Sequence, residues 1–264
     1  MLDGPTEKLT DRYNREAHAY RELWAPVLHS AGLSLLHELA HAPVQRILDV
    51  GTGVGTLLRD LRAAFPGAFV LGADRAHGML ALAPGEFPRT VMDARQLAIP
   101  NASFDLVLLI FMLFHLEKPL DGLLEARRVL RPGGSVATLT WAGDLTSQAT
   151  QIWTESLDVH GAPPVDPAVE ARHAAVDTPE KMETLLRIAG FTSPRCWAGD
   201  LIWTLDLEHL LRLRTSMGSA KSRFDSLDPL TREACVATAR SLMQGLACED
   251  FVARGRIVYA VAIA

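Results

Sequence analysis

The chain has 264 residues, of which 48% are hydrophobic and 22% are charged, a composition typical of a folded globular protein. Its formal net charge of −5 argues against nucleic acid as the main partner, because binding to phosphates usually requires a basic face. The longest apolar run, Leu106 to Phe114, is far shorter than the about 20 residues that cross a membrane, and residues 1–16 lack the apolar segment of a secretory signal. We therefore expect a cytoplasmic protein that binds neither nucleic acid nor a membrane.

The three cysteines, Cys196, Cys235 and Cys248, are scattered and form no CxxC pair. This spacing favours reduced thiols over a zinc site or a disulfide framework. No bound metal is expected.

The first half of the chain changes from a helical to an alternating pattern. Residues 1–42 are expected to be helical, with Thr10 as a candidate cap and apolar residues at helical spacing in SLLHELA. Strands are then expected at residues 44–50, 68–73, 90–92, 104–110 and 135–141, and helices at 56–64 and 120–130. Such alternation predicts an α/β fold with a parallel sheet, helices on both faces, and a ligand at the carboxyl ends of the strands.

The second half is less regular. Residues 144–176 are expected to be an insertion with short helical pieces. A helix follows, capped by Asp177 or Thr178 and ended by Gly190. Residues 206–250 are expected to be mostly helical, and residues 256–263 to form the final strand.

A glycine-rich stretch, ILDVGTGVGTL, follows the first expected strand. Its glycines are Gly51, Gly53 and Gly55, whereas a dinucleotide-binding loop has its third glycine three residues after the second. Asp49, just before the loop, would repel a pyrophosphate at close range. It would attract a ligand with ammonium and sulfonium charges and no phosphate, such as S-adenosylmethionine, so a nicotinamide oxidoreductase is the weaker alternative.

Four ordered motifs resemble those of the class I, Rossmann-like S-adenosylmethionine-dependent methyltransferases. LDVGTGVG resembles their first motif, VLGADRAHGML the second, and VMDARQLAIPNASFDLVLLIFMLFHL the third and fourth. EARRVLRPGGSVATLTW resembles the helix, turn and fifth strand that follow. The similarity runs from about residue 44 to 142 and is closest to the small-molecule branch that includes the ubiquinone/menaquinone-biosynthesis methyltransferases.

The resemblance implies a fold and a reaction. The fold is a Rossmann-like, mostly parallel seven-stranded sheet with helices on both faces, an N-terminal helical cap over residues 1–42 and a cofactor-binding domain over residues 43–264. Helical insertions at about 144–176 and 206–250 would form a lid. The implied reaction is methyl transfer from S-adenosylmethionine to a small, apolar or aromatic metabolite, by a monomer or homodimer. A non-methylating reaction on the same fold, such as cyclisation, and a non-enzymatic binding protein remain alternatives, although the three acids Asp49, Asp74 and Asp93 argue against the latter.

The resemblance also implies roles for single residues. Asp74 would accept the ribose hydroxyls, Asp93 and Ala94 would contact adenine, Met79 would pack on its face, and Tyr20 would reach the methionine carboxylate. Asp74 as a helix cap, Met79 as a core residue and Tyr20 as a helix-packing residue are the alternatives. The full set of implied cofactor residues is Tyr20, Asp49, Gly51, Thr52, Gly53, Gly55, Asp74, Arg75, Met79, Asp93, Ala94 and Phe111.

His115 is the titratable residue that follows the fourth expected strand. We consider it a candidate general base or substrate contact with a pKa near 6.5, against a histidine packed on the sheet. The segment before it lacks the Asn/Asp-Pro-Pro-aromatic motif of enzymes that methylate amines of bases, which favours an apolar acceptor. Four indoles are candidates for lining an aromatic pocket, with ordinary packing as the alternative: Trp141, Trp153, Trp197 and Trp203.

Overall fold

The computed structural model describes residues 5–39 and 44–264. The predicted boundary between a helical cap and the main domain, at residues 42 and 43, lies outside the described residues. No described helix is long and apolar enough to cross a membrane.

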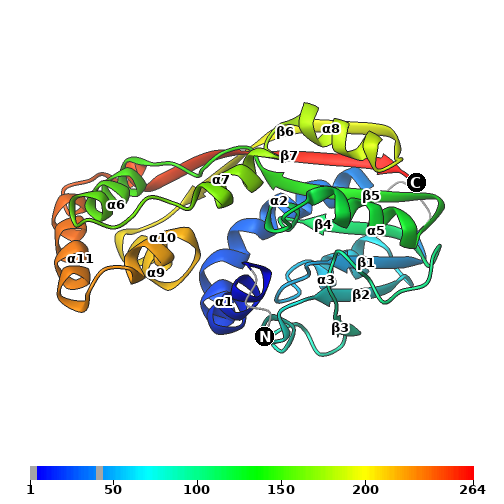
Figure 1. Ribbon diagram of the computed structural model, residues 1–264, viewed down its shortest axis with the longest axis horizontal. Coiled ribbons are helices and arrows are strands. Elements are labelled where there is room, and N and C mark those ends of the chain that lie inside the picture. Colours follow the sequence, from blue (N-terminus) through cyan, green and yellow to red (C-terminus); the bar gives the residue numbers. More distant parts are fainter. Residues whose placement is uncertain (1–4, 40–43) are drawn as a thin grey trace.

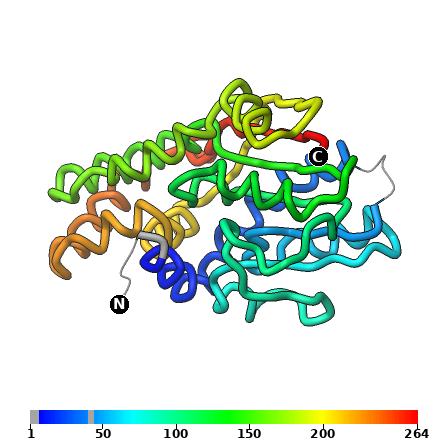
Figure 2. Tube along the Cα trace, turned by 45° about the vertical axis from the view of Figure 1, so that its right-hand side comes forward, coloured from blue at the N-terminus to red at the C-terminus, as the bar shows by residue number. Residues whose placement is uncertain are grey.

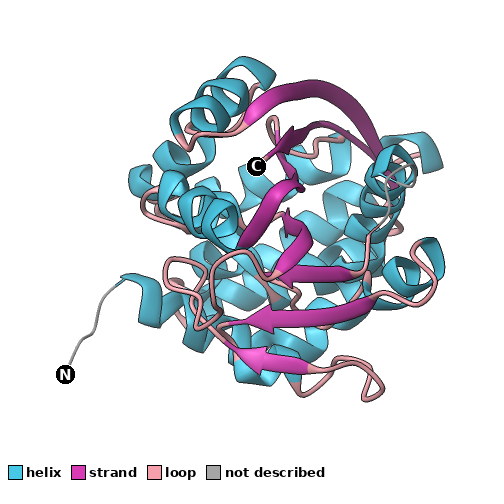
Figure 3. Cartoon of the chain, turned by 90° about the vertical axis from the view of Figure 1, so that its right-hand side faces the viewer, coloured by secondary structure: helices cyan, strands magenta, loops and turns pink. Residues whose placement is uncertain are grey.

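One sheet runs through the molecule, and its strand order within the described residues is β3-β2-β1-β4-β5-β7-β6. Strands β1 to β5 pair in parallel, and β7 pairs antiparallel with both β5 and β6 (Figure 3). The predicted seven-stranded, mostly parallel sheet is confirmed. The strands are β1 (Arg46–Val50), β2 (Phe69–Asp74), β3 (Arg89–Val91), β4 (Phe104–Ile110), β5 (Leu130–Trp141), β6 (Thr192–Thr204) and β7 (Val252–Ile263).

Helices cover both faces of this sheet, as the alternating pattern predicts (Figure 3). Residues 5–39 form one long helical segment, and its middle part, η1, has π-helical hydrogen bonding. The elements of this part are α1 (Pro5–Ala19), η1 (Tyr20–Trp24), α2 (Ala25–Leu39), α3 (Leu58–Ala64), α4 (His77–Leu80), η2 (Leu113–His115), α5 (Pro119–Val129) and α8 (Pro179–Ile188). Thr10 lies inside α1, so the predicted cap at Thr10 is wrong, whereas Thr178 does cap α8 by accepting the N–H of Lys181.

A second helical group stands at the far end of β6 and β7 (Figures 1 and 2). It has an apolar cluster of its own that includes Trp153, Leu210, Cys235 and Met243. Its helices, together with the neighbouring α7, come from the two predicted insertions: α6 (Gln148–Val159), α7 (Pro167–Ala174), α9 (Leu207–Ser216), α10 (Gly218–Asp225), α11 (Pro229–Met243) and η3 (Cys248–Phe251). Helix α1 contacts both α4 and α9, so it lies between the sheet and this group (Figure 2).

Two features of the sheet differ from the sequence prediction. Strand β6 has no predicted counterpart, because Pro194 and Gly199 interrupt its pattern. It tolerates them because it is an edge strand: the register shifts between Thr192 and Arg195, around the proline, and Gly199 gives room to the ring of Tyr259. The turn that the sequence predicts before the fifth strand lies within β5, where the register of the pairing with β4 shifts.

The topology places a ligand site near the glycine loop. Strand order reverses between β1 and β4, since the chain builds outward from β1 to β3 on one side and from β4 to β5 on the other. In such sheets the loops after the two central strands separate and leave a crevice at the carboxyl ends. Here those loops are the glycine-rich stretch after β1 and the segment from Phe111 to His115 after β4.

Candidate functional site

The glycine loop turns back over β2. Gly51, Gly53 and Gly55 have φ angles of 75°, 57° and 72°, which glycine adopts without strain. The N–H groups of Gly51 and Thr52 donate to the carbonyl of Ala73 at 2.8 and 3.0 Å. Backbone bonding to the neighbouring strand therefore fixes the start of the loop.

Asp74 fastens the same loop from the end of β2. Its Oδ2 accepts the N–H of Gly53 at 2.8 Å, and its Oδ1 accepts the N–H of Ala76 at 2.8 Å. Burial raises the pKa of Asp74, and these N–H groups act against that rise. Each oxygen keeps a second lone pair that a ligand hydroxyl can use.

A pocket of about 120 Å³ lies between the loop, the end of β4 and the N-terminal helices. The structure gathers most of the predicted site residues around it: Tyr20, Gly51, Gly53, Asp74, Arg75, Met79, Asp93, Ala94, Phe111 and His115. Three other predicted residues, Asp49, Thr52 and Gly55, do not line it.

Those three residues support the loop instead. The hydroxyl of Thr52 donates to Oδ2 of Asp49 at 2.7 Å, and both side chains are buried. Burial raises the pKa of Asp49 to about 6, opposed by the Thr52 bond. A Cβ on Gly55 would lie 2.8 Å from Cδ of Pro84, so this glycine allows close packing outside the pocket.

Arginines surround the acid at the β3 side of the pocket. Arg95 holds Asp93 with two nitrogens, at 2.7 Å from Nη2 and 3.0 Å from Nε, and Nη1 of Arg75 lies 3.6 Å from its Oδ2. The hydrogen bonds from Arg95 lower the pKa of Asp93, so it is an ionised acceptor at neutral pH. Nη1 of Arg75 is buried and makes no hydrogen bond to a described residue.

Aromatic side chains cover the pocket from the N-terminal helices. Tyr13 shares a hydrogen bond with Nε2 of His115 at 2.8 Å, and its ring packs edge-on against Tyr20 at 6.1 Å between centroids. Burial raises the pKa of both tyrosines, so their hydroxyls stay protonated. Both tyrosines match aromatic positions that the sequence resemblance implies as a cover for the cofactor, although only Tyr20 is in the predicted set of cofactor residues.

His115 differs from the sequence expectation. Burial, together with the smaller effects of the nearby Arg12, His173 and Arg172, lowers its pKa to about 3. The imidazole is therefore neutral at every pH near 7 and is a much weaker base than a histidine with a pKa near 6.5.

A wall of aromatic rings continues beyond Phe111. Phe111 lies 4.7 Å from Trp141, and Trp24 lies 5.7 Å from both Trp141 and Trp203, measured between ring centroids. Phe111 has a φ of 51°, a strained angle for a non-glycine residue, and its N–H donates to the carbonyl of Leu139. The strand-end turn thus holds its ring in a fixed position.

Only part of the predicted tryptophan set joins this wall. Trp141 and Trp203 belong to it, whereas Trp197 stacks on Tyr259 and Trp153 is a core residue of the second helical group. Trp24 was not predicted. Its spacing of four residues from Tyr20 on one helix is the signal that would have identified it.

The pocket residues match S-adenosylmethionine in charge and in hydrogen-bonding groups. A Cβ on Gly53 would lie 3.2 Å from Cε of Met79, so the glycine keeps open the space between loop and methionine. Acceptors at Asp74 and Asp93 match hydroxyl and amine donors. The free volume is smaller than the about 300–1,000 Å³ of typical small-molecule sites, so binding requires movement of the covering side chains.

Residues 48–138 match the methyltransferase domain family. A malonyl-[acyl-carrier protein] O-methyltransferase of Hahella chejuensis is 31% identical over 151 residues, which are 55% of this chain and 54% of that protein. A demethylmenaquinone methyltransferase of Deinococcus radiodurans is 36% identical over 108 residues, which are 38% of this chain and 44% of that protein. The chain thus spans about half the length of these curated relatives.

The fold has solved counterparts. An S-adenosylmethionine-dependent methyltransferase from Thermotoga maritima superimposes with a TM-score of 0.55 over 96% of this chain and 98% of that one, at 17% identity. At this identity the likeness shows the Rossmann-like fold alone. The match of residues 48–138 to the methyltransferase domain supports the family that the four sequence motifs predict.

Proposed function

We propose that this chain, a member of the Rossmann-like S-adenosylmethionine-dependent methyltransferases, transfers a methyl group from that cofactor to a small, apolar or aromatic metabolite. The observation that carries the proposal is the composition of the crevice after β1 and β4. One side presents the glycine loop with Asp74 and Asp93, and the other presents Phe111 with Trp141 behind it.

The cofactor side is assigned residue by residue. The oxygens of Asp74, oriented by the N–H groups of Gly53 and Ala76, would accept the ribose hydroxyls. Asp93 and Ala94 would contact adenine, with Met79 on its face, and Tyr20 would donate its hydroxyl to the methionine carboxylate. Asp49, buried behind the loop without a cationic partner among the described residues, would favour the positive end of the ligand by its negative charge.

The chemistry requires little from the protein beyond alignment. Bound S-adenosylmethionine supplies a methyl group that its sulfonium charge already activates. The chain holds the acceptor in line and excludes water, through the rings of Phe111, Tyr13 and Tyr20. His115, with its pKa at about 3, accepts a hydrogen bond or orients Tyr13 rather than removing a proton from an alcohol.

The acceptor class follows from the walls that the acceptor would touch. The rings of Phe111, Trp141, Trp24 and Trp203 offer apolar faces and few polar atoms. The relatives are named for acceptors as different as malonyl-[acyl-carrier protein] and demethylmenaquinone, so their names do not choose one. An aromatic or apolar ring that stacks on these faces is the acceptor that the site supports best.

The predicted organisation belongs to the same proposal. Residues 1–42 would act as a cap over the cofactor, and the insertions at about 144–176 and 206–250 as a lid over the acceptor. The protein would work in the cytoplasm as a monomer or homodimer, without nucleic acid or a membrane.

Mass spectrometry tests the reaction. The protein is incubated with S-adenosylmethionine carrying a deuterated methyl group and a panel of phenols, quinols and aliphatic acids. The proposal expects S-adenosylhomocysteine and an acceptor carrying the label. Conversion of an acceptor without gain of a methyl group would instead support the alternative, a non-methylating reaction such as cyclisation.

A further inference from the structure

One arginine of the second helical group is partly buried without a partner. Arg214 lies in the last turn of α9, and its Nε is buried and makes no hydrogen bond. Within residues 5–39 and 44–264, nothing forms an ion pair or hydrogen bond with its guanidinium group. Burial lowers the pKa of Arg214, but a guanidinium group stays protonated in proteins. The fold therefore holds a partly desolvated positive charge here.

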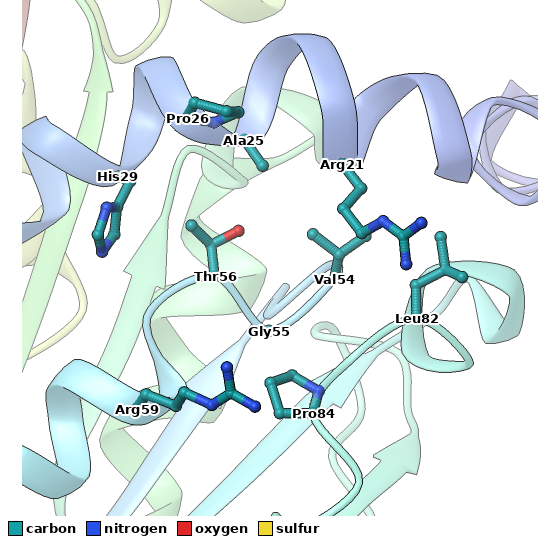
Figure 4. Close-up of a pocket in the computed structure, with 10 residues that line it drawn as sticks. All are labelled: Arg21, Ala25, Pro26, His29, Val54, Gly55, Thr56, Arg59, Leu82 and Pro84. Carbon is teal, nitrogen blue, oxygen red and sulfur yellow. The ribbon is translucent and has the colours of Figure 1, made fainter.

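Two other arginines show how the chain accommodates such groups elsewhere. Arg223, buried in the same helical group, donates its Nε to the carbonyl of Pro163 at 2.6 Å and pairs with Asp158. Arg21 is exposed in an open hollow beside the glycine loop, where water hydrates it (Figure 4). Arg214 has neither protein partners nor full hydration, a costly state that a ligand with a negative charge would relieve.

Arg214 belongs to the helix that packs against the aromatic wall. Its neighbour Leu213 is buried in a cluster against which Trp24 and Trp203 pack. Through its contact with Trp141, Trp24 continues the wall to the end of β4. The wall therefore runs from the cofactor side of the crevice to α9.

A second series of contacts also connects the crevice with Arg214. Asp144, in the loop after β5, acts electrostatically on both Arg214 and His173 of α7. The ring of His173 lies 4.4 Å from that of Phe114, which is next to His115 of the pocket. Asp144 is exposed, and in the described chain it forms no ion pair with Arg214. It therefore places the guanidinium group near the crevice without neutralising it.

Another unpaired nitrogen lies on the same helix. His209 packs edge-on against Trp203 at 5.4 Å between ring centroids, and its Nε2 is buried without a hydrogen bond to any described residue. Buried polar groups in folded proteins are normally paired. Two such unpaired nitrogens on α9, at the end of the aromatic wall, point to a ligand with polar atoms at this place.

We propose, on the basis of the methyl transfer proposed above, that Arg214 binds a carboxylate of the acceptor and that the acceptor is an aromatic acid. Its ring would lie along the aromatic wall. A guanidinium group donates two parallel hydrogen bonds to a carboxylate, and one positive charge matches one negative charge. Arg214 does not line the pocket that holds Asp74 and Asp93, so the bound carboxylate is at the end of the acceptor remote from the methylated atom.

Isothermal titration calorimetry of the full chain, with S-adenosylhomocysteine bound, tests the proposal. The probes are matched pairs of an aromatic acid and its amide, built on benzene, cinnamic and naphthalene skeletons. The wild type should bind at least one acid about tenfold more tightly than its amide, as expected for a hydrogen bond to a charged group. Arg214→Gln should remove this preference, and Arg214→Lys should restore part of it.

The matched control is Arg212→Gln on the same helix. Arg212 is exposed and pairs with Glu22 at 3.2 Å, so its loss should leave the preference for the acid unchanged. Arg214→Gln should melt at or above the wild-type temperature, because it removes a charge that no described residue pairs with. A lower melting temperature would make Arg214 a structural residue and overturn the proposal.

The binding data separate this proposal from the proposed function. If no acid in the panel binds more tightly than its amide, or if the preference persists in Arg214→Gln, the role of Arg214 is refuted even where S-adenosylhomocysteine binds and a methyl group is transferred. Failure of the wild type to bind S-adenosylhomocysteine would instead refute the proposed function on which this inference rests.

Discussion

Replacement of Asp74 by alanine should weaken binding of S-adenosylhomocysteine about 10- to 150-fold. The carboxylate of Asp74 faces the pocket with both oxygens already oriented by backbone N–H groups, so it would bond the ribose without rearranging. A hydrogen bond to a charged group contributes about 1.5–3 kcal/mol, and each 1.4 kcal/mol is a factor of ten in affinity.

The same substitution should also lower stability. It removes the acceptors of the Gly53 and Ala76 N–H groups, and each unpaired group costs about 1–3 kcal/mol where water cannot replace the bond. A thermal melt must therefore accompany calorimetry, so that affinity is measured on folded protein. Asp74→Asn, which keeps one acceptor oxygen, should show a smaller loss of stability.

Asp105 is a matched control at the other end of the sheet. Its Oδ2 accepts the N–H groups of Gln45 and Arg46 at 3.0 and 2.9 Å, so it fastens backbone as Asp74 does, but away from the pocket. Asp105→Ala should lower the melting temperature and leave the affinity for S-adenosylhomocysteine unchanged. Equal affinities of folded Asp74→Ala and wild type would refute the role of Asp74 in binding.

Three further predictions concern the loop and the covered histidine. Gly53→Val should abolish cofactor binding in a folded protein, as calorimetry would show. The φ of Gly53 is 57°, and a Cβ there would lie 3.2 Å from Cε of Met79, so a branched side chain has no room. Normal affinity would mean that the loop does not approach the ligand. Asp49→Asn should stabilise the ligand-free protein at pH 7–8 by up to about 2–3 kcal/mol. The folded-state pKa of Asp49, about 6, lies above the ordinary 3.8, so the protonated carboxyl contributes stability that the wild type loses as pH rises through about 6. Asparagine carries no charge and avoids this loss. Denaturant melts from pH 4 to 8 would measure the difference in free energy of unfolding between Asp49→Asn and the wild type, which should grow as pH rises. A difference that does not change with pH would contradict the prediction. At saturating S-adenosylmethionine, where titration of Asp49 no longer affects cofactor occupancy, the wild-type turnover should be flat from pH 5 to 9, because the pKa of His115 is about 3. A rise through pH 6.5 that disappears in His115→Gln would restore the histidine as a general base.

The local sequence pattern was sufficient to predict most strands of the sheet. Strand β4 has the predicted bounds because its continuous apolar run is buried on both faces, as a central parallel strand requires. The glycine loop and Asp74 meet as expected, because the carboxyl ends of adjacent parallel strands lie at one edge. Strand β6 could not be located in the same way, since an edge strand tolerates Pro194 and Gly199.

The unpredicted parts of the site depend on long-range packing. The low pKa of His115 results from burial next to Tyr13, which is 102 residues earlier in the chain. Whether a tryptophan lines the acceptor side or fills a core depends on where the second helical group folds, and this separates Trp203 from Trp153. Gly55 shares the motif with Gly53, yet its role is decided by Pro84, which packs against it.

Calorimetric titration of the wild-type protein with S-adenosylhomocysteine, in parallel with NADH, tests the central claim most directly. The acids Asp49, Asp74 and Asp93 around or behind the glycine loop predict one saturable site for S-adenosylhomocysteine and no binding of NADH, whose pyrophosphate they would repel. Saturable binding of NADH without binding of S-adenosylhomocysteine would contradict the account.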